Sequence, residues 1–388
     1  MLIRYVNRDY VKRFGKKSYK VPDDTGAGLV RRGIAEAVIS SVGAPPVSKV
    51  PSVDAKPKIG TDGSKSQAPA EKVVKGDVVK RKQQAFRGFP RVGWVHDSVT
   101  LGGAELSNQT VIAAGEQLGF NIYQCYPGTF DKHELARCDL LIINNFFHFE
   151  MPQMHFILDL LFEYKRPFVK YDHDHREIMG DQARPKLARL LFGRSILNVF
   201  ISPFHADNFR KALGDIVEPY FLLPPAIDTG IFKLIPEVER DPNKVVNVTG
   251  RLYESKGFRH VLHFCLSREG KNTFEVYTRN HQAVKNTFGQ MKHVEVFPLL
   301  PNETLPKIYN SAGFVLHLPH ALEACGRTVA EGLLCGCQPI INKNVGIQSF
   351  KGLNVGDQKK FNPDLFRRVC KQGIWEFWKA VELKFYGY

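Results

Sequence analysis

No stretch of this 388-residue sequence stays apolar for the roughly 20 residues that a membrane-spanning helix needs. The opening residues, MLIRYVNRDYVKRFGKK, lack the apolar stretch typical of a signal peptide. Cysteine is scarce and scattered: there are seven, and Cys335-Gly-Cys337 is spaced too closely for a usual metal-binding pair. We therefore expect a cytoplasmic protein without a transmembrane segment, whose thiols stay reduced.

Several catalytic signatures are also missing. No Ser-His-Asp or Cys-His arrangement has supporting context and there is no Walker loop, so neither a covalent hydrolase nor a P-loop enzyme is indicated. What is present is 43% hydrophobic residues, including 28 Phe, which is typical of a globular protein. The length is sufficient for two ordinary domains, each with its own core.

The positive charge is unevenly distributed along the chain. Residues 1–90 contain 19 Lys and Arg against 8 Asp and Glu, so they carry +11 of the total net charge of +15. The remaining 35 basic and 31 acidic residues nearly balance. A polyanion such as DNA is therefore a candidate partner for residues 1–88, and the larger part of the chain shows no such bias.

Three zones follow one another along the sequence. Residues 1–43 form a small basic N-terminal module, with a predicted strand end at Tyr19–Pro22 and a short helix after Asp23. Residues 44–88 are rich in Pro, Ser, Lys, Ala and Asp and nearly free of aromatics, so we predict a flexible linker. Ordered structure should resume at Arg91.

From Arg91 onward, short apolar runs alternate with amphipathic stretches, which predicts parallel sheets covered on both faces by helices. The helix candidates include 105–118 and 153–164, and a C-terminal helix that packs through Trp375, Phe377 and Trp378. The strand candidates are 92–95, 121–125, 140–143, 168–171 and 199–201, then 245–248, 273–277, 293–296, 314–318 and 338–342.

The two series of strands predict an α/β protein with two doubly wound, Rossmann-like domains that face a cleft. We assign residues 89–235 to the first domain, on the acceptor side, and residues 236–388, with the C-terminal helices, to the second. The short segment 345–388 must supply the last helices and the crossing back to the first domain. Ligands of such folds bind at the carboxyl ends of the strands, where the following motifs fall.

Two glycine-containing loops are candidates for binding phosphate. Gly102 and Gly103 precede a predicted helix, so they would let a phosphate approach its N-terminus, although a tight strand–helix turn explains them equally well. Arg251 and Lys256 follow the strand 245–248 between two glycines and could neutralise a diphosphate. The alternative for this pair is an ordinary charged surface loop.

Two further motifs carry acids and histidines. Glu323 and Glu331 lie eight residues apart around Gly326, so both could face one ligand at a helix start; a solvated helix face is the alternative. The segment 171–175 (YDHDH) follows a strand. Its first interpretation is a His173 positioned near a transferred sugar, the second a polar loop, and the third a divalent metal site.

Taken in order, these segments resemble the retaining GT-B glycosyltransferases of family 4. The resemblance covers roughly residues 91–347, and it departs from the family pattern at Gly346-Ile347, where a glycine pair is usual. Residues 1–43 have no place in that family and resemble small domains seen in tailed-phage genes. The matching motifs are 102–105 (GGAE), 167–174 (PFVKYDHD), 222–228 (LLPPAID), 250–252 (GRL) with 256–258 (KGF), 323–332 (EACGRTVAEG) and 335–339 (CGCQP).

The resemblance implies a nucleoside diphosphate sugar as donor, most often a UDP- or GDP-sugar, and no required metal. Gly102 and Gly103 would lie against its diphosphate on one side. Arg251 and Lys256 would bind the diphosphate from the other side, with Gly326 near the phosphates. Positive charge on the leaving diphosphate would then be the main catalytic contribution.

The remaining roles also follow from the resemblance. Glu331 would hold the ribose hydroxyls, Glu323 would contact the donor sugar, and His173 would lie by sugar and acceptor. Arg327 belongs to the same donor-binding segment. The implied activity is sugar transfer with retention of anomeric configuration, in the host cytoplasm if a phage encodes the protein.

Two alternatives to this interpretation stay open. One is a non-catalytic binding or virion-associated protein on a GT-B scaffold, with the basic module and linker as a tether. The other concerns the acceptor, which could be a protein, a lipid, a glycan or a DNA base brought close by residues 1–88.

Overall fold

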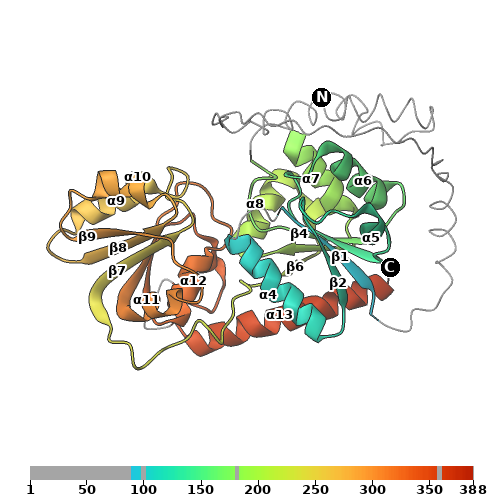
Figure 1. Ribbon diagram of the computed structural model, residues 1–388. Helices are drawn as coiled ribbons and strands as arrows, with labels where there is room; N and C mark the ends of the chain where they lie inside the picture. The colour runs from blue at the N-terminus through green and yellow to red at the C-terminus, as the bar shows by residue number, and fades with distance from the viewer. Residues whose placement is uncertain (1–88, 98–101, 180–182, 356–360, 388) are drawn as a thin grey trace, which may run out of the picture.

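The computed structural model describes residues 89–97, 102–179, 183–355 and 361–387, which form two α/β lobes (Figure 1). The predicted module at 1–43 and linker at 44–88 lie outside the described residues. Among the described residues, none of the helices combines the length and apolarity needed to cross a bilayer.

The first lobe contains a parallel sheet in the order β2-β1-β3-β4-β5-β6. Its strands are β1 (Arg91–Val95), β2 (Asn121–Cys125), β3 (Leu140–Ile143), β4 (Phe168–Tyr171), β5 (Leu197–Phe200) and β6 (Tyr220–Leu222). Its helices are α4 (Gly103–Gln117), α5 (Lys132–Ala136), α6 (Met151–Phe162), α7 (Ala183–Arg194), α8 (Pro203–Leu213) and the 3₁₀ turn η4 (Asp215–Val217).

The second lobe contains a parallel sheet in the order β11-β10-β7-β8-β9. Its strands are β7 (Asp241–Thr249), β8 (Thr273–Thr278), β9 (Val294–Pro298), β10 (Ala312–His317) and β11 (Gln338–Ile341). Its helices are α9 (Phe258–Ser267), α10 (His281–Phe288), α11 (Leu305–Ser311), α12 (Arg327–Leu334) and the 3₁₀ turn η5 (Gly346–Ser349).

Alternation along the strands explains why helices cover both faces of the first sheet. In β3, Leu140 and Ile142 pack into one core while Leu141 and Ile143 pack into another, because successive side chains of a strand point to opposite faces. The first core lies under α4, and the second lies under α5, α6 and α7 on the opposite face (Figure 1). The predicted two-domain α/β fold is confirmed.

Helix α13 (Pro363–Tyr386) connects the cores of both lobes (Figure 1). Its first turns place Phe366 and Cys370 in the core of the second lobe, and its later turns place Phe377 and Trp378 in the core of the first. The predicted crossing back to the first domain is thereby confirmed. The C-terminal end of α13 packs against the core of the first lobe, although in the sequence it follows the second lobe.

Most predicted strands match the observed ones, and three of them have the predicted bounds: 121–125, 140–143 and 168–171. The strand predicted at 199–201 begins at Leu197 instead. The short β6 was not predicted, because its three residues are only half-buried and are flanked by prolines. All seven cysteines are buried, and none forms a disulfide.

Candidate functional site

Two helix N-termini, one from each lobe, meet at the candidate site. Gly103 begins α4 and Arg327 begins α12, and a Cβ added to Gly103 would lie 3.5 Å from Cδ of Arg327. The first N–H groups of a helix lack intrahelical partners and carry partial positive charge. The meeting of two such ends forms an environment suited to an anion such as a diphosphate.

Lys256 and Glu323 form an ion pair beside these helix starts. Lys256 Nζ lies 2.6 Å from Glu323 Oε2, and Nε2 of His317 lies 3.6 Å from the same oxygen. Although burial by itself favours the neutral acid, Lys256 and His317 hold the pKa of Glu323 well below its ordinary value. In turn, Glu323 raises the pKa of Lys256, so both groups stay charged at neutral pH.

The loops that carry these side chains depend on two glycines with positive φ. Gly257 has φ +86°, and a Cβ there would lie 1.8 Å from the carbonyl oxygen of Leu318. Gly326 has φ +91°, and a Cβ there would lie 2.7 Å from Cγ1 of Val345. Other residues would be strained at both positions, so these glycines set how closely the loops pack.

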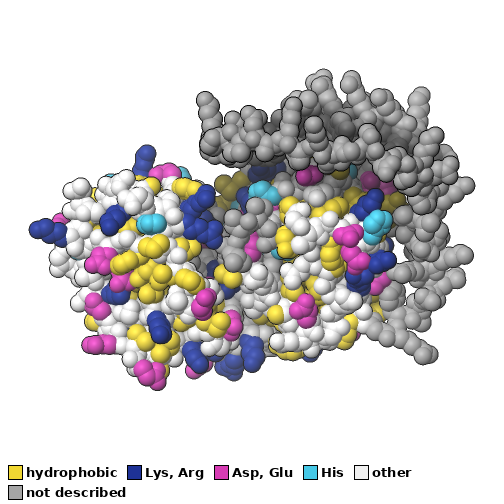
Figure 2. Space-filling view, in the orientation of Figure 1, with side chains coloured by type: hydrophobic (Ala, Val, Ile, Leu, Met, Phe, Trp, Pro, Cys, Tyr) yellow, Lys and Arg dark blue, Asp and Glu magenta, His cyan; other side chains and the backbone are white. Residues whose placement is uncertain are grey.

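Arg251 takes no part in the Lys256–Glu323 ion pair. Its side chain is exposed, and Nη1 donates to the hydroxyl of Tyr253 at 2.9 Å. Among the described residues it has no ion-pair partner, so its guanidinium is available to a ligand at the carboxyl end of β7. Figure 2 shows Lys and Arg side chains gathered at the edge of the second lobe that borders the first.

Glu331 is buried rather than open to the gap. Its side chain is 3% exposed; Oε1 accepts from Nε of Arg327 at 2.7 Å, and Oε2 accepts from the Tyr309 hydroxyl at 3.3 Å. Burial raises its pKa, and Arg327 opposes that shift. Arg327 also donates from Nη1 to Ser107 Oγ at 2.9 Å and to the Ala226 carbonyl at 2.7 Å, so it connects the two lobes.

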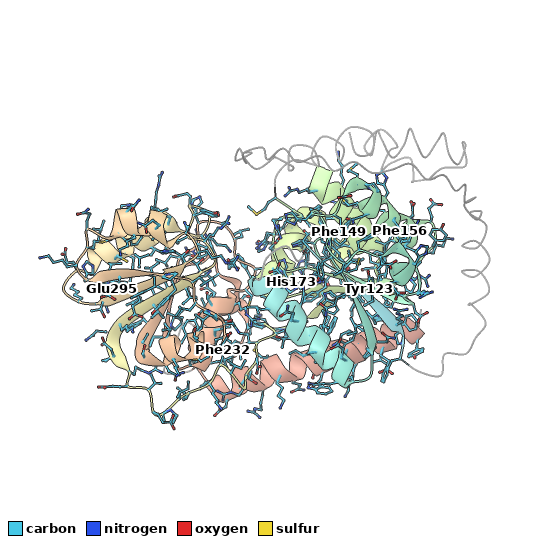
Figure 3. The ribbon with its side chains drawn as sticks, in the orientation of Figure 1. Tyr123, Phe149, Phe156, His173, Phe232 and Glu295 are labelled. Carbon is cyan, nitrogen blue, oxygen red and sulfur yellow. The ribbon has the colours of Figure 1, made fainter. Side chains whose placement is uncertain are left out.

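His173 lies at the end of α4 nearest the second lobe (Figure 3). Its Nε2 lies 2.8 Å from Oδ1 of Asn108 on α4, and its ring centroid is 4.3 Å from that of Tyr171. Burial lowers the pKa of His173 to about 3, so the imidazole is neutral at physiological pH. A neutral, held imidazole can exchange hydrogen bonds with a sugar or an acceptor.

The acids on either side of His173 are paired with cations of the protein. Asp172 lies 3.3 Å from Nζ of the buried Lys170, and Asp174 lies 2.6 Å from Nε of Arg176. Within the described ranges, no cluster of three or more His, Cys, Asp or Glu has the arrangement of a metal site. These pairings weaken the third interpretation of 171–175, a divalent metal site.

Sequence reasoning missed several polar residues at the carboxyl edge of the first sheet. His96 and Asp97 directly follow β1, while Asn144 and Asn145 directly follow β3, and all four are buried. Asn145 donates to Asp174 Oδ2 at 3.2 Å, which ties the loop after β3 to the loop that carries His173. Their position after correctly predicted strands was the available signal.

Two surface hollows lie outside this cluster. They have volumes of about 390 and 320 Å³, and neither is lined by Gly103, Lys256 or His173. The first is lined by His260, His263, Phe264, Ser267, Leu318 and Asn342.

No protein-family model and no curated protein sequence matches the chain. Solved structures do match. Anabaena Alr3699/HepE in complex with UDP-glucose has 17% identity and a TM-score of 0.53, covering 76% of this chain and 93% of that one. An alpha-glucosyltransferase in complex with UDP-glucose and DNA containing an abasic site has 14% identity and a TM-score of 0.52, covering 77% and 93%. These similarities show a GT-B fold.

Proposed function

We propose that this protein is a glycosyltransferase that moves a sugar from a nucleoside diphosphate sugar to a hydroxyl acceptor. The observation that carries the proposal is the meeting of the two helix N-termini at Gly103 and Arg327, beside the Lys256–Glu323 pair. UDP-glucose in the similar structures of Alr3699/HepE and the alpha-glucosyltransferase supports a UDP-sugar as donor. A GDP-sugar is the alternative donor.

In the proposed reaction, the bond between the sugar C1 and the diphosphate oxygen breaks, C1 forms a bond to the acceptor oxygen, and the hydroxyl proton passes to the departing diphosphate or to water. The leaving diphosphate keeps the electron pair, and Lys256, Arg251 and the helix N–H groups stabilise its charge. Glu323 accepts hydrogen bonds from sugar hydroxyls while it remains paired with Lys256. His173 contributes a neutral imidazole beside the transferred sugar.

The proposed ribose site at Glu331 requires a local rearrangement. Because both carboxylate oxygens have partners in the protein, ribose hydroxyls must share them with Arg327 and Tyr309 or displace one. Retention of configuration, a location in the cytoplasm, a phage origin and the absence of a required metal remain predictions from the sequence.

A charge-removing substitution tests the donor site. We expect Lys256→Met to weaken binding of UDP-glucose or a GDP-sugar by about 10- to 100-fold, since a hydrogen bond to a charged group contributes about 1.5–3 kcal/mol. Isothermal titration calorimetry measures the affinity, and release of UDP or GDP measures turnover. Lys285→Met, on the exposed face of α10, is the matched control.

The outcomes separate the competing functions. Failure of the wild-type protein to bind either donor would overturn the proposal. Binding without turnover, unaffected by Lys256→Met, would favour the non-catalytic alternative. A DNA acceptor is supported by the DNA-bound alpha-glucosyltransferase and by the basic residues 1–88, and it predicts that their deletion abolishes retention on a DNA column at low salt.

A further inference from the structure

The loop after β4 contains an ion pair, Asp174 with Arg176, that has no role in the proposed donor site. Asp174 Oδ2 lies 2.6 Å from Nε of Arg176, and Asp174 Oδ1 accepts from the backbone N–H of Arg176 at 2.8 Å. The Arg176 side chain is still 49% exposed, and its two terminal nitrogens have no hydrogen-bond or ion-pair partner among the described residues. One edge of the guanidinium is therefore bound by the protein, and the other is open to a ligand.

Asp174 is itself held in place by neighbouring elements. Asn145, in the loop after β3, donates to Asp174 Oδ2 at 3.2 Å, and Nε2 of His205 on α8 lies 2.9 Å from the Asp174 carbonyl oxygen. Because the acid is fixed, the guanidinium that it binds is oriented before a ligand arrives. This orientation reduces the side-chain entropy that is lost on binding.

Asp97 is a second acid near Arg176. It directly follows β1 and is buried, and its Oδ1 accepts from the backbone N–H of His148 at 2.9 Å. Partial burial by itself lowers the pKa of Arg176, but Asp174 and, to a smaller extent, Asp97 raise it above its ordinary value. The two acids thus stabilise the charged guanidinium at the carboxyl edge of the first sheet.

Hydrogen bonds connect the loop after β4 to the loop that carries Glu323. The backbone N–H of His205, whose ring contacts the loop after β4, donates to Ser202 Oγ at 3.0 Å. The Ser202 hydroxyl donates to the carbonyl of Ala324 in the second lobe. Ala324 directly follows Glu323, which forms the ion pair with Lys256. The loop after β4 therefore borders the Lys256–Glu323 pair of the candidate site.

Arg176 interacts electrostatically with Lys256 of the other lobe. Glu323 raises the pKa of Lys256 most, and Arg176 lowers it, as a nearby cation does. Two cations that repel each other in this way attract an anion that lies near both. Lys256 and Arg327 are each paired with a glutamate, so much of their charge is balanced before a ligand binds. A cation from the first lobe therefore adds to the stabilisation of a diphosphate that gains charge as the sugar leaves.

We propose that Arg176 binds the donor diphosphate from the first lobe and that Asp174 orients it. This inference rests on the proposed glycosyltransferase function. Nη1 and Nη2 donate to two oxygens of the phosphate joined to the sugar, because His173, three residues before Arg176, borders the transferred sugar in that proposal. When the C1–O bond breaks, the electron pair stays on the diphosphate, and Arg176 stabilises the added charge without giving up a proton. Because Arg176 acts on the leaving group alone, its role is compatible with retention of configuration.

Nucleotides with one and two phosphates test this assignment on the full-length protein. We expect Arg176→Gln to bind UDP about 10- to 100-fold more weakly than the wild type does, the range for losing a hydrogen bond to a charged group. Binding of UMP, which lacks the second phosphate, should be unchanged, and Arg176→Lys should keep part of the UDP affinity. Isothermal titration calorimetry measures both nucleotides, with GDP and GMP in their place if the protein prefers guanosine. Arg210→Gln is the matched control, because Arg210 is 50% exposed and pairs with Asp207 at 2.9 Å in the same lobe.

An Asp174→Asn background tests the orienting role of the acid. In that background Arg176→Gln should cost less UDP affinity than in the wild type, because the guanidinium is no longer held in place. An equal loss in both backgrounds would show that Asp174 does not orient Arg176 toward the diphosphate.

Turnover of UDP-glucose separates this inference from the function on which it rests. In Arg176→Gln we expect kcat to fall by about 10-fold or more, together with UDP affinity, while the melting temperature persists. Wild-type UDP affinity and kcat in this variant, or an equal loss for UMP and UDP, would overturn the inference and leave the glycosyltransferase proposal intact. If Arg176→Gln melts early, the ratio of UDP to UMP affinity in Arg176→Lys decides instead. Loss of donor binding in the wild type itself would overturn the proposed function.

Discussion

A lysine in the middle of a core strand supports the loop that carries His173. Lys170 is fully buried in β4, and its Nζ lies 3.3 Å from Asp172 and 2.9 Å from Glu177. Burial raises the pKa of Asp172, and it raises the pKa of Glu177 to about 8. Because one ammonium balances one carboxylate, the trio retains a shared proton at neutral pH, and its two acids anchor both ends of the segment 172–177.

The raised pKa of Glu177 predicts how stability depends on pH. The folded protein keeps a proton that the unfolded chain releases above pH 4.5, so this group makes stability fall as pH rises from about 4.5 to about 8. Glu177→Gln mimics the protonated acid and should remove that fall. Urea unfolding at intervals between pH 5.5 and 8.5 measures it.

The same trio provides a contrasting variant. Lys170→Met leaves two buried acids without a cation and should destabilise the protein by about 3–5 kcal/mol. A pH slope in Glu177→Gln equal to that of the wild type would contradict the assignment of the shared proton.

At the scale of elements, the indole ring of Trp378 on α13 packs against α4. Trp378 donates from Nε1 to the carbonyl of Val111 at 2.9 Å, and its ring packs on Trp94 with centroids 6.0 Å apart. The ring occupies the space beside Gly115, where an added Cβ would lie 2.3 Å from Cζ2 of Trp378. The absence of a side chain at Gly115 is thus what lets the two helices approach.

We expect Gly115→Ala to destabilise the protein by about 1–3 kcal/mol, the usual range for overpacking a core. Trp378→Phe removes the ring atoms that clash, so the double variant should be more stable than the sum of the two single effects predicts. Urea unfolding of the wild type, the two single variants and the double variant gives the four free energies of the double-mutant cycle. Gly128→Ala, whose Cβ would make an ordinary 3.5 Å contact, is the control. Additive effects would show that the ring and the glycine are not coupled.

Elements with a strong local signal were predictable from the sequence. Strand β3 is a continuous buried apolar run, and α4 follows a glycine pair, so both were assigned within two residues. Strand β6 has three half-buried residues, which are too few to show the apolar pattern that predicts a strand. Lys170 was included in a predicted strand, but no sequence pattern indicates that its side chain is buried and paired with Asp172 and Glu177.

The motifs that carry the candidate site residues could be identified from the sequence, whereas the contacts between distant residues could not. Glu323 and Glu331 form a local motif, and their loop was identified from it. The contact of His148 with Asp97 joins residues 51 apart, and that of Arg327 with Ser107 joins residues 220 apart. Both depend on which strands and lobes become neighbours, which no local pattern specifies.

At the scale of the whole molecule, a small set of polar contacts fixes one lobe against the other. Arg327 donates to Ser107 Oγ and to the Ala226 carbonyl. The hydroxyl of Ser202, at the start of α8, donates to the Ala324 carbonyl, and the backbone N–H of Phe204 donates to Ser349 Oγ at 3.0 Å. The lobes are therefore held together beside the site where the two helix N-termini meet.

Arg327 combines this contact with its ion pair to Glu331, and two variants separate the roles. Arg327→Leu leaves a buried carboxylate without its cation, so we expect a loss of about 3–5 kcal/mol. Adding Glu331→Gln should recover most of that loss, while small-angle X-ray scattering should still show a larger radius of gyration than in the wild type. A double variant as compact as the wild type would show that the other contacts suffice.

The burial of all seven thiols has a practical consequence for such measurements. Maleimide dyes react with exposed thiolates, and burial raises the pKa of Cys125, Cys138 and Cys265 to about 12, which keeps them protonated. Cysteines introduced at the exposed positions Lys211 on α8 and Lys285 on α10 would thus be labelled selectively in the native background. Energy transfer between two fluorophores there would report any change in the distance between the lobes in real time, without a cysteine-free variant having to be built first.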